Sequence, residues 1–156
     1  MKIVIRAGGL GKRLWPMSRK DRPKQFLKLI SDKTLLHDTV ERVASMINPG
    51  ADLFVSGRYD SRDEILKYAP GVMADNLILE PASRNTGPAI CLECAFLEKR
   101  FGPETIVVTL PSDDYISDAQ AFRDLLRQAE EFLENNPDYI LTPAVRPDEV
   151  DTGYSY

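Results

Sequence analysis

The sequence has 156 residues, of which 43% are apolar and 28% are charged, and its formal net charge is −4 at pH 7. This length suits one domain with a buried core, and no apolar run approaches the ~20 residues that a membrane-spanning helix requires. The acidic balance argues against a nucleic-acid-binding surface, and the first residues begin a strand pattern without a basic-then-apolar leader. We therefore expect a cytoplasmic protein that binds neither nucleic acid nor membrane.

Short apolar runs alternate with helical periods along the chain, which is typical of an α/β fold with a mainly parallel sheet. The predicted strands cover residues 2–5, 53–56, 76–80, 105–110 and 139–145. The predicted helices cover residues 34–47, 61–68, 89–100 and 117–135, with Pro88 in the first turn of the third. No repeat, low-complexity tract or linker divides the chain, so we expect one domain.

Three local patterns make further predictions about burial and capping. The apolar run at residues 106–108 predicts a strand buried on both faces. The residues from Ser117 to Gln120 resemble a capping box, and the helix that follows should turn Leu125 and Leu126 inward.

The cysteines and the single histidine all lie in helical patterns. Cys91 and Cys94 form a C-x-x-C, but a redox pair is expected at a helix N-terminus, and a zinc site needs two further ligands where the chain offers only His37. We predict buried free thiols and a structural histidine.

A glycine-rich stretch directly follows the first predicted strand. Gly8, Gly9 and Gly11 allow the backbone to turn at positive φ and allow amide groups to approach an anion. Residues 12–28 then carry seven basic side chains and one acidic one, a local charge of +6 in an acidic chain. This combination predicts a polyphosphate site. It is not a P-loop, because no Gly-Lys-Ser/Thr follows, and it is not a dinucleotide fingerprint, because Leu14 stands where the third glycine would be.

The stretch matches the G-G-x-G-x-R-L-x-P…P-K signature of sugar-1-phosphate nucleotidyltransferases. Its sequence L-W-P-M-S-R…P-K-Q-F most resembles the mannose-1-phosphate guanylyltransferase branch of that family. The resemblance implies a Rossmann-like three-layer sandwich of the GT-A-like nucleotidyltransferase type. Two positions depart from the family pattern, since Arg6 stands where an apolar residue is usual and Lys12 where threonine is usual.

The loop after the third predicted strand carries the second shared motif, L-E-P-A-S-R-N-T-G-P-A. Guanine presents N1–H and N2–H2 as paired donors, which the carboxylate of Glu80 can accept in two hydrogen bonds. The family implies that backbone groups near Thr86 and Gly87 read the rest of the base. Arg84 either contacts the nucleotide or fixes the loop, and Asn85 is either a ligand or a turn residue.

The loop after the fourth predicted strand reads L-P-S-D-D-Y-I. The family aspartate that matches Asp113 holds Mg2+ (or Mn2+), a hard cation that suits one or two carboxylates with phosphates and water. Asp114 replaces the usual histidine. Because successive side chains of an extended backbone point apart, we expect one metal ligand here.

The resemblance implies that the oxygen of a sugar phosphate attacks the α-phosphorus of GTP without a covalent enzyme intermediate. Arg13 is assigned to the β- and γ-phosphates, Lys24 to the α-phosphate and the sugar phosphate, and Asp113 to the metal. These three are the predicted catalytic residues. The predicted nucleotide-binding residues are Ala7, Gly8, Gly9, Gly11, Lys12, Arg13, Glu80, Arg84, Asn85, Thr86, Gly87 and Ser112.

The last residues resemble the family segment that begins the sugar-binding half. Thr152 and Gly153 are therefore predicted to contact the sugar phosphate, together with Lys24. In the family the chain continues beyond this segment, so residues 1–156 are expected to form only the nucleotide-binding portion of a truncated domain. A sheet cut in this way would expose an edge, and a homodimer is one expected result.

Three functions remain open from the sequence. The first is transfer of GMP to mannose 1-phosphate or to another sugar 1-phosphate. The second is a nucleotide-binding fragment without turnover. The third is an unrelated flavodoxin-like or dehydrogenase module.

Overall fold

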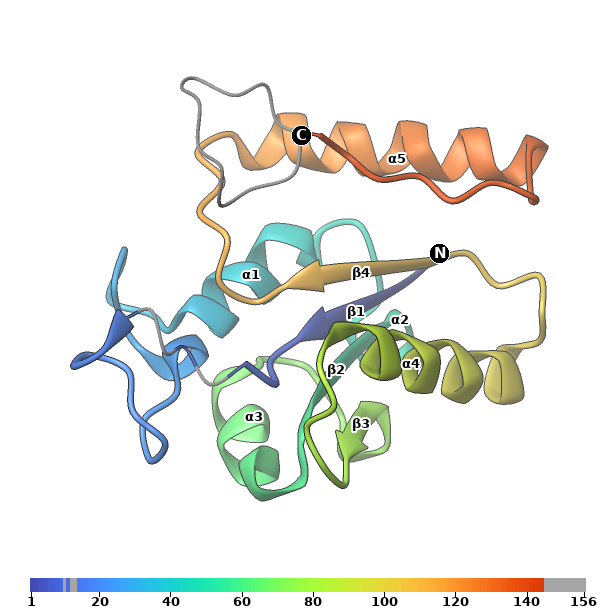
Figure 1. The fold of residues 1–156 in the computed structure, drawn as a ribbon. Coiled ribbons are helices and arrows are strands. Elements are labelled where there is room, and N and C mark those ends of the chain that lie inside the picture. The colour runs from blue at the N-terminus through green and yellow to red at the C-terminus, as the bar shows by residue number, and fades with distance from the viewer. Residues whose placement is uncertain (10, 12–13, 145–156) are drawn as a thin grey trace.

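A four-stranded parallel sheet forms the centre of the molecule (Figure 1). The computed structural model describes residues 1–9, 11 and 14–144. The strands are β1 (Lys2–Arg6), β2 (Leu53–Arg58), β3 (Leu77–Glu80) and β4 (Val107–Pro111), in the order β3-β2-β1-β4. Ile3 of β1 lies opposite Leu53 on one side and Val108 on the other. The α/β prediction with a parallel sheet is confirmed.

Helices cover both faces of the sheet and complete three layers. The α-helices are α1 (Leu35–Ala44), α2 (Pro49–Asp52), α3 (Arg62–Tyr68), α4 (Thr86–Phe101) and α5 (Ala119–Asn135). Short 3-10 helices lie at η2 (Lys24–Phe26), η3 (Tyr59–Ser61) and η4 (Ala74–Asn76). One apolar cluster joins the sheet to residues of α1, α3 and α5, and a second joins it to α4. Among the described residues, no helix is both long and apolar enough to cross a bilayer.

Helices α1 and α5 each begin where a side chain satisfies a free backbone N–H group. The side chain of Thr34 caps α1 by accepting from the backbone N–H of His37 at 3.2 Å. The side chain of Asp118 caps α5 by accepting from Ala121 at 2.9 Å. The predicted capping box had placed this role at Ser117, so that prediction is wrong by one residue.

The predicted strand at residues 139–145 does not form over residues 139–144, and Val145 lies outside the described residues. Ile140 is 94% exposed, and the ring of Tyr139 lies 5.8 Å from that of Phe132 on α5. Figure 1 shows this segment running beside α5. Because β4 thus has one strand neighbour, its valines are half-buried and not buried on both faces as predicted. Leu126 of α5 is buried as predicted, but Leu125 is 44% exposed.

The prediction that the thiols are buried is also wrong. Cys91 and Cys94 are free and exposed, because the buried stripe of α4 is Ala89, Glu93 and Leu97. This spacing of four residues follows one face of the helix and leaves both cysteines off it. His37 lies part-exposed on α1, with its Nε2 atom 3.3 Å from the carboxylate of Glu41, consistent with a structural role.

Candidate functional site

The carboxyl ends of the four parallel strands meet at one edge of the sheet and border a cavity of about 600 Å3. Ligands of open α/β sheets bind at this edge. Most of the predicted site residues that the structure describes line the cavity. They are Gly8, Gly9, Gly11, Lys24, Glu80, Asn85, Thr86, Ser112 and Asp113. Segments distant in sequence are therefore brought together as the motifs predicted.

Two of the glycines are required by close packing at the cavity. A Cβ atom at position 8 would lie 3.0 Å from Oε1 of Glu80. At position 11 it would lie 2.5 Å from the Ser18 hydroxyl oxygen, and the backbone φ there is +62°. Gly11 is the one glycine of the three that takes positive φ. Gly8 thus allows close approach of Glu80, and Gly11 combines close packing with a left-handed backbone, whereas a Cβ atom at Gly9 would have an ordinary contact of 3.6 Å with Lys24.

Residues of η2 contact the glycine-rich stretch and hold its backbone in place. Gln25 is 1% exposed, and its side-chain amide donates to the carbonyl oxygen of Ala7 at 2.6 Å. Ala7 is itself buried and does not line the cavity, and its predicted contact with the nucleotide stays a prediction. Sequence reasoning quoted Gln25 within the motif but gave it no function. Its neighbour Lys24 leaves the same short helix toward the cavity.

Lys24 and Asp113 form an ion pair in the wall of the cavity, and the Lys24 ammonium donates to a carboxylate oxygen of Asp113. The two side chains are 26% and 28% exposed. The pair joins η2 to the end of β4, which are 89 positions apart in sequence. It places a carboxylate and an ammonium at one point of the cavity wall, as the predicted metal and phosphate contacts require.

The described residues contain no group of three or more His, Cys, Asp or Glu side chains that would hold a metal by themselves. Mg2+ does not need one, because it commonly takes one or two carboxylates and completes its shell with phosphate oxygens and water. Asp113 lines the cavity and fits that role, whereas Asp114 does not line it. Burial and the charge of Asp113 raise the pKa of Asp114, and its backbone oxygen accepts from Arg42 at 2.9 Å.

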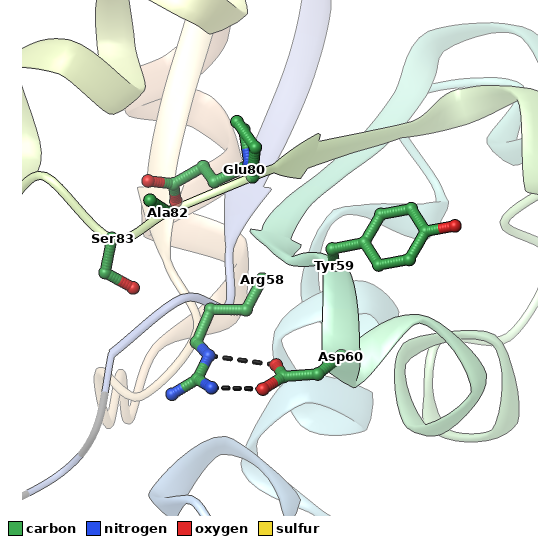
Figure 2. A pocket seen from close by; sticks show the side chains of 7 residues that line it. Arg58, Tyr59, Asp60, Glu80, Ala82 and Ser83 are labelled. Carbon is green, nitrogen blue, oxygen red and sulfur yellow. Dashed lines mark hydrogen bonds and ion pairs between the residues drawn. The ribbon is translucent and has the colours of Figure 1, made fainter.

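Glu80 ends β3 and borders two hollows. Burial raises the pKa of its carboxyl group, and the positive charge of Arg6 partly offsets that effect. The second hollow, of about 430 Å3, also contains Arg58, Tyr59 and Asp60. Figure 2 shows the guanidinium of Arg58 joined to the carboxylate of Asp60, with the Tyr59 ring turned away. Arg6 lines the larger cavity together with Glu80, and its positive charge acts on that carboxyl group.

The loop between β3 and α4 contains a strained residue. Asn85 has φ 67° and ψ −172°, a region that is nearly restricted to glycine. It directly precedes α4, and both Asn85 and Thr86 line the cavity. Gly87 and Arg84 are exposed and do not line it. Strain of this kind costs roughly 1–3 kcal/mol and is common at ligand-binding loops.

A buried polar network behind the cavity was missed by sequence reasoning. Glu93 of α4 is 1% exposed and accepts hydrogen bonds from the hydroxyls of Ser56 at 2.5 Å and Thr109 at 3.3 Å. Its Oε1 atom lies 3.8 Å from Nε of Arg6. The available signal was the departure of Arg6 from the family pattern. Glu93 gave a weaker signal: it lies four residues after Ala89, on the helix face that also carries Ala89 and Leu97.

Four predicted site residues lie outside the described part of the chain. They are Lys12, Arg13, Thr152 and Gly153.

Comparison with known proteins gives consistent matches. The family model described as nucleotidyl transferase matches residues 2–156. Similar curated proteins include the mannose-1-phosphate guanylyltransferase of Escherichia coli K12, 38% identical over 157 residues, and RfbM of Salmonella typhimurium LT2, a protein of the same name, 37% identical over 160 residues. Each alignment covers 98% of this chain and 32% of the relative. The chain thus spans about a third of the length of these relatives.

A solved structure shares the fold. The crystal structure described as mannose-1-phosphate geranyltransferase from Thermus thermophilus superposes with a TM-score of 0.75 and 39% sequence identity. The match covers 85% of this chain and 38% of that one. The name of that protein specifies a geranyl group where the names of the relatives specify a guanylyl group, but it specifies the same sugar phosphate. The nucleotidyltransferase-type fold predicted from the sequence is confirmed.

Proposed function

Because the chain belongs to the nucleotidyl transferase family, we propose that residues 1–156 form the nucleotide-binding portion of an enzyme that transfers GMP from GTP to mannose 1-phosphate. The products are GDP-mannose and pyrophosphate. One observation carries the proposal: the glycine-rich stretch, Glu80 and the Lys24–Asp113 pair all border a single cavity. Family membership makes the alternative flavodoxin-like or dehydrogenase module untenable.

The chemistry needs positioning and charge more than a protein nucleophile. A phosphate oxygen of the sugar phosphate attacks the α-phosphorus of GTP, the bond from that phosphorus to the bridging oxygen breaks, and pyrophosphate leaves with the electron pair. Lys24 is proposed to neutralise charge on the α-phosphate as this happens, and its ammonium has three donors, of which Asp113 uses one in the ion pair. Holding the two reactants in line supplies much of the rate enhancement.

Asp113 is the residue proposed to hold Mg2+ or Mn2+. When bound, the ion would neutralise charge on the nucleotide phosphates. Asp113 would supply the carboxylate ligand, and the ammonium of Lys24 keeps two further donors for phosphate. The donor chemistry fits this role, because a single carboxylate with phosphates and water is an ordinary Mg2+ environment.

The base is assigned to the Glu80 side of the cavity. An ionised Glu80 accepts from N1–H and N2–H2 of guanine, a donor pair that adenine lacks. Backbone groups of Thr86 and Gly87 are proposed to contact the remaining edge. Arg13 on the β- and γ-phosphates and the sugar contacts of Thr152 and Gly153 stay predictions.

Calorimetric titration of the chain with GTP, ATP and UTP in the presence of Mg2+ tests the proposal. We expect binding that favours GTP by at least about tenfold, the scale of one bidentate base contact. A release assay for pyrophosphate then compares mannose 1-phosphate with glucose 1-phosphate. Equal affinity for the three nucleotides, or no binding, would contradict the proposal.

The same assays distinguish the alternatives. GTP binding without pyrophosphate release would favour a nucleotide-binding fragment that needs further chain for turnover, a reading consistent with its coverage of a third of its relatives. Faster release with another sugar 1-phosphate would change the sugar and not the reaction. A cytoplasmic location and a homodimer stay predictions, and size-exclusion chromatography with light scattering checks the second.

A further inference from the structure

Arg6 lies at the centre of the cavity edge, at a position where the sequence departs from the family pattern. It ends β1, one of the two interior strands of the sheet, and pairs in register with Ser56 on β2 and Pro111 on β4. Successive residues of a strand alternate between faces, so Arg6 shares the α4 face with Val4, a member of the α4-side apolar cluster. Its side chain is 28% exposed and lines the cavity.

Glu93 holds this arginine from behind. The carboxylate lies 3.8 Å from the inner nitrogen Nε of Arg6, and Ser56 and Thr109 donate to its two oxygens. Within the described part of the chain, the two terminal nitrogens of Arg6 have no hydrogen-bond partner. A buried carboxylate is costly unless it is paired and hydrogen-bonded. The charge of Arg6 on β1 and the hydroxyls of Ser56 on β2 and Thr109 on β4 offset the cost of burying Glu93. The terminal N–H groups of Arg6 remain available to a ligand in the cavity.

The fork has a specific chemical complement on one nucleobase. Guanine carries two adjacent acceptors, O6 and N7, and arginine commonly binds both at once. Adenine presents the N6 amino group in place of O6, so the same fork would face a donor. Glu80 borders the same cavity, and its carboxylate would supply acceptors for the adjacent N1–H and N2–H2 edge.

We infer that Arg6 is a base-reading residue that binds O6 and N7 of guanine, that Glu93 positions its guanidinium, and that Arg6 and Glu80 together select GTP. This inference rests on the proposed function, since it concerns the same nucleotide. It adds a specificity residue at a position where the family pattern has an apolar side chain. The competing role for a cavity arginine is contact with phosphate, which every nucleoside triphosphate carries.

Calorimetric titration in Mg2+ with GTP, 7-deaza-GTP and ATP separates these roles. For the unmodified chain we expect about tenfold weaker binding of 7-deaza-GTP, which lacks the N7 acceptor. For Arg6→Leu we expect GTP affinity to fall by about 10- to 100-fold and ATP affinity to change less than about threefold. Arg6→Lys keeps the charge but not the fork, and should lose the same preference. Arg58→Leu, an arginine at the end of the neighbouring strand held by Asp60, should change neither affinity.

The positioning role of Glu93 is tested by a double-mutant cycle with Arg6. Glu93→Gln keeps an acceptor for Ser56 but removes the charge that orients Arg6. We expect it to weaken GTP binding several-fold with little effect on ATP, and to add no further loss in the Arg6→Leu background, as expected for residues that act together.

The outcomes separate failure of the inference from failure of the proposed function. Equal loss of GTP and ATP affinity in Arg6→Leu would overturn base reading in favour of phosphate contact or a structural role. Unchanged GTP preference in that variant would also overturn it, while the proposed function stands. If Arg6→Leu does not fold, equal affinity of the unmodified chain for GTP and 7-deaza-GTP overturns the inference. An unmodified chain without GTP preference overturns both.

Discussion

The two faces of the sheet differ in what they bury. The face toward α1, α3 and α5 is apolar, with side chains such as Leu36, Val40 and Ile65 almost fully buried. The face toward α4 has a cluster of four buried apolar residues, and beyond it, at the carboxyl edge, lies the network of Arg6 and Glu93. The first face is covered by the apolar side chains of α1, α3 and α5, whereas residues on the α4 side, such as Arg6 and Ser56, line the cavity.

This difference separates stability from recognition. Burial of apolar side chains on the first face supplies free energy of folding without any demand on geometry at the cavity. On the second face, the carboxylate of Glu93 is buried beside Arg6 at a cost to folding, and we propose that this pair orients Arg6 toward a ligand. We therefore expect substitutions on the two faces to have different consequences, and four predictions test this.

The largest effect is expected on the apolar face. Leu36→Ala should lower the free energy of unfolding by about 2–5 kcal/mol, because it removes a fully buried side chain and leaves a cavity. Chemical denaturation measures this, and Leu125→Ala on exposed α5 should cost under about 0.5 kcal/mol. The folded fraction of Leu36→Ala should keep its preference for GTP over ATP. A changed preference would break the separation of the two faces.

The next effect concerns catalysis. Lys24→Ala should reduce turnover by at least about 100-fold, or roughly 2.7 kcal/mol of transition-state stabilisation, with the fold intact. Steady-state pyrophosphate release measures turnover, and circular dichroism checks the fold. Lys20→Ala, an exposed lysine of the same basic stretch, is the matched control and should stay near normal. Near-normal turnover of Lys24→Ala would remove Lys24 from the proposed mechanism.

The third effect tests the cost of burying Glu93. Burial raises its pKa above the ordinary 4.5, so its contribution to stability is fullest below 4.5 and is lost as pH rises through the raised value. Glu93→Gln cannot titrate. The stability of the unmodified chain relative to this variant should therefore fall as pH rises from 4.5 through the raised pKa of Glu93.

Thermal unfolding of both proteins across that range measures the change. Leu97→Ala lies on the same helix face without adding or removing a titrating group, so its deficit should not depend on pH. A stability difference between the unmodified chain and Glu93→Gln that is constant from pH 4.5 to 8 would show that the carboxyl group carries no such cost.

The smallest effect concerns strain at the cavity edge. Asn85→Gly should raise the free energy of unfolding by up to about 1 kcal/mol, because relief of strain outweighs the added chain entropy. Asn136→Gly, at φ −141°, offers no such relief and should not stabilise. Denaturant midpoints measure both. If the Asn85 variant is destabilised instead, side-chain contacts and not backbone geometry hold this residue.

Local pattern was sufficient to predict most of the fold and the centre of the site. Apolar runs located all four strands of the sheet, and glycine and proline placed the loops. Glu80, Lys24 and Asp113 were identified because their motifs fall directly after a strand or within the basic stretch. Parallel strands bring their carboxyl ends together, so residues far apart in sequence met in one cavity.

The failures share a physical cause, which is dependence on partners distant in sequence. The segment at residues 139–144 has strand-like composition, but a strand requires a neighbour to pair with, and this segment lies beside α5 instead. Cys91 and Cys94 are apolar in character but fall off the face of α4 that meets the sheet. Glu93 replaces them in the interior, because Ser56 and Thr109 supply hydrogen bonds that no local pattern announces.

The sequence by itself determined where the strands and helices of the sheet and its covering layers fall along the chain. It also determined the position of the glycine-rich stretch and the identity of the charged residues that follow the strands. These depend on hydrophobic periodicity and on residues with distinct backbone preferences, both of which are local. Only the tertiary structure decided that Arg6 faces the cavity, that Glu93 is buried behind it, and that Lys24 meets Asp113. Each of these depends on electrostatic and hydrogen-bond partners that become neighbours only when the sheet has formed.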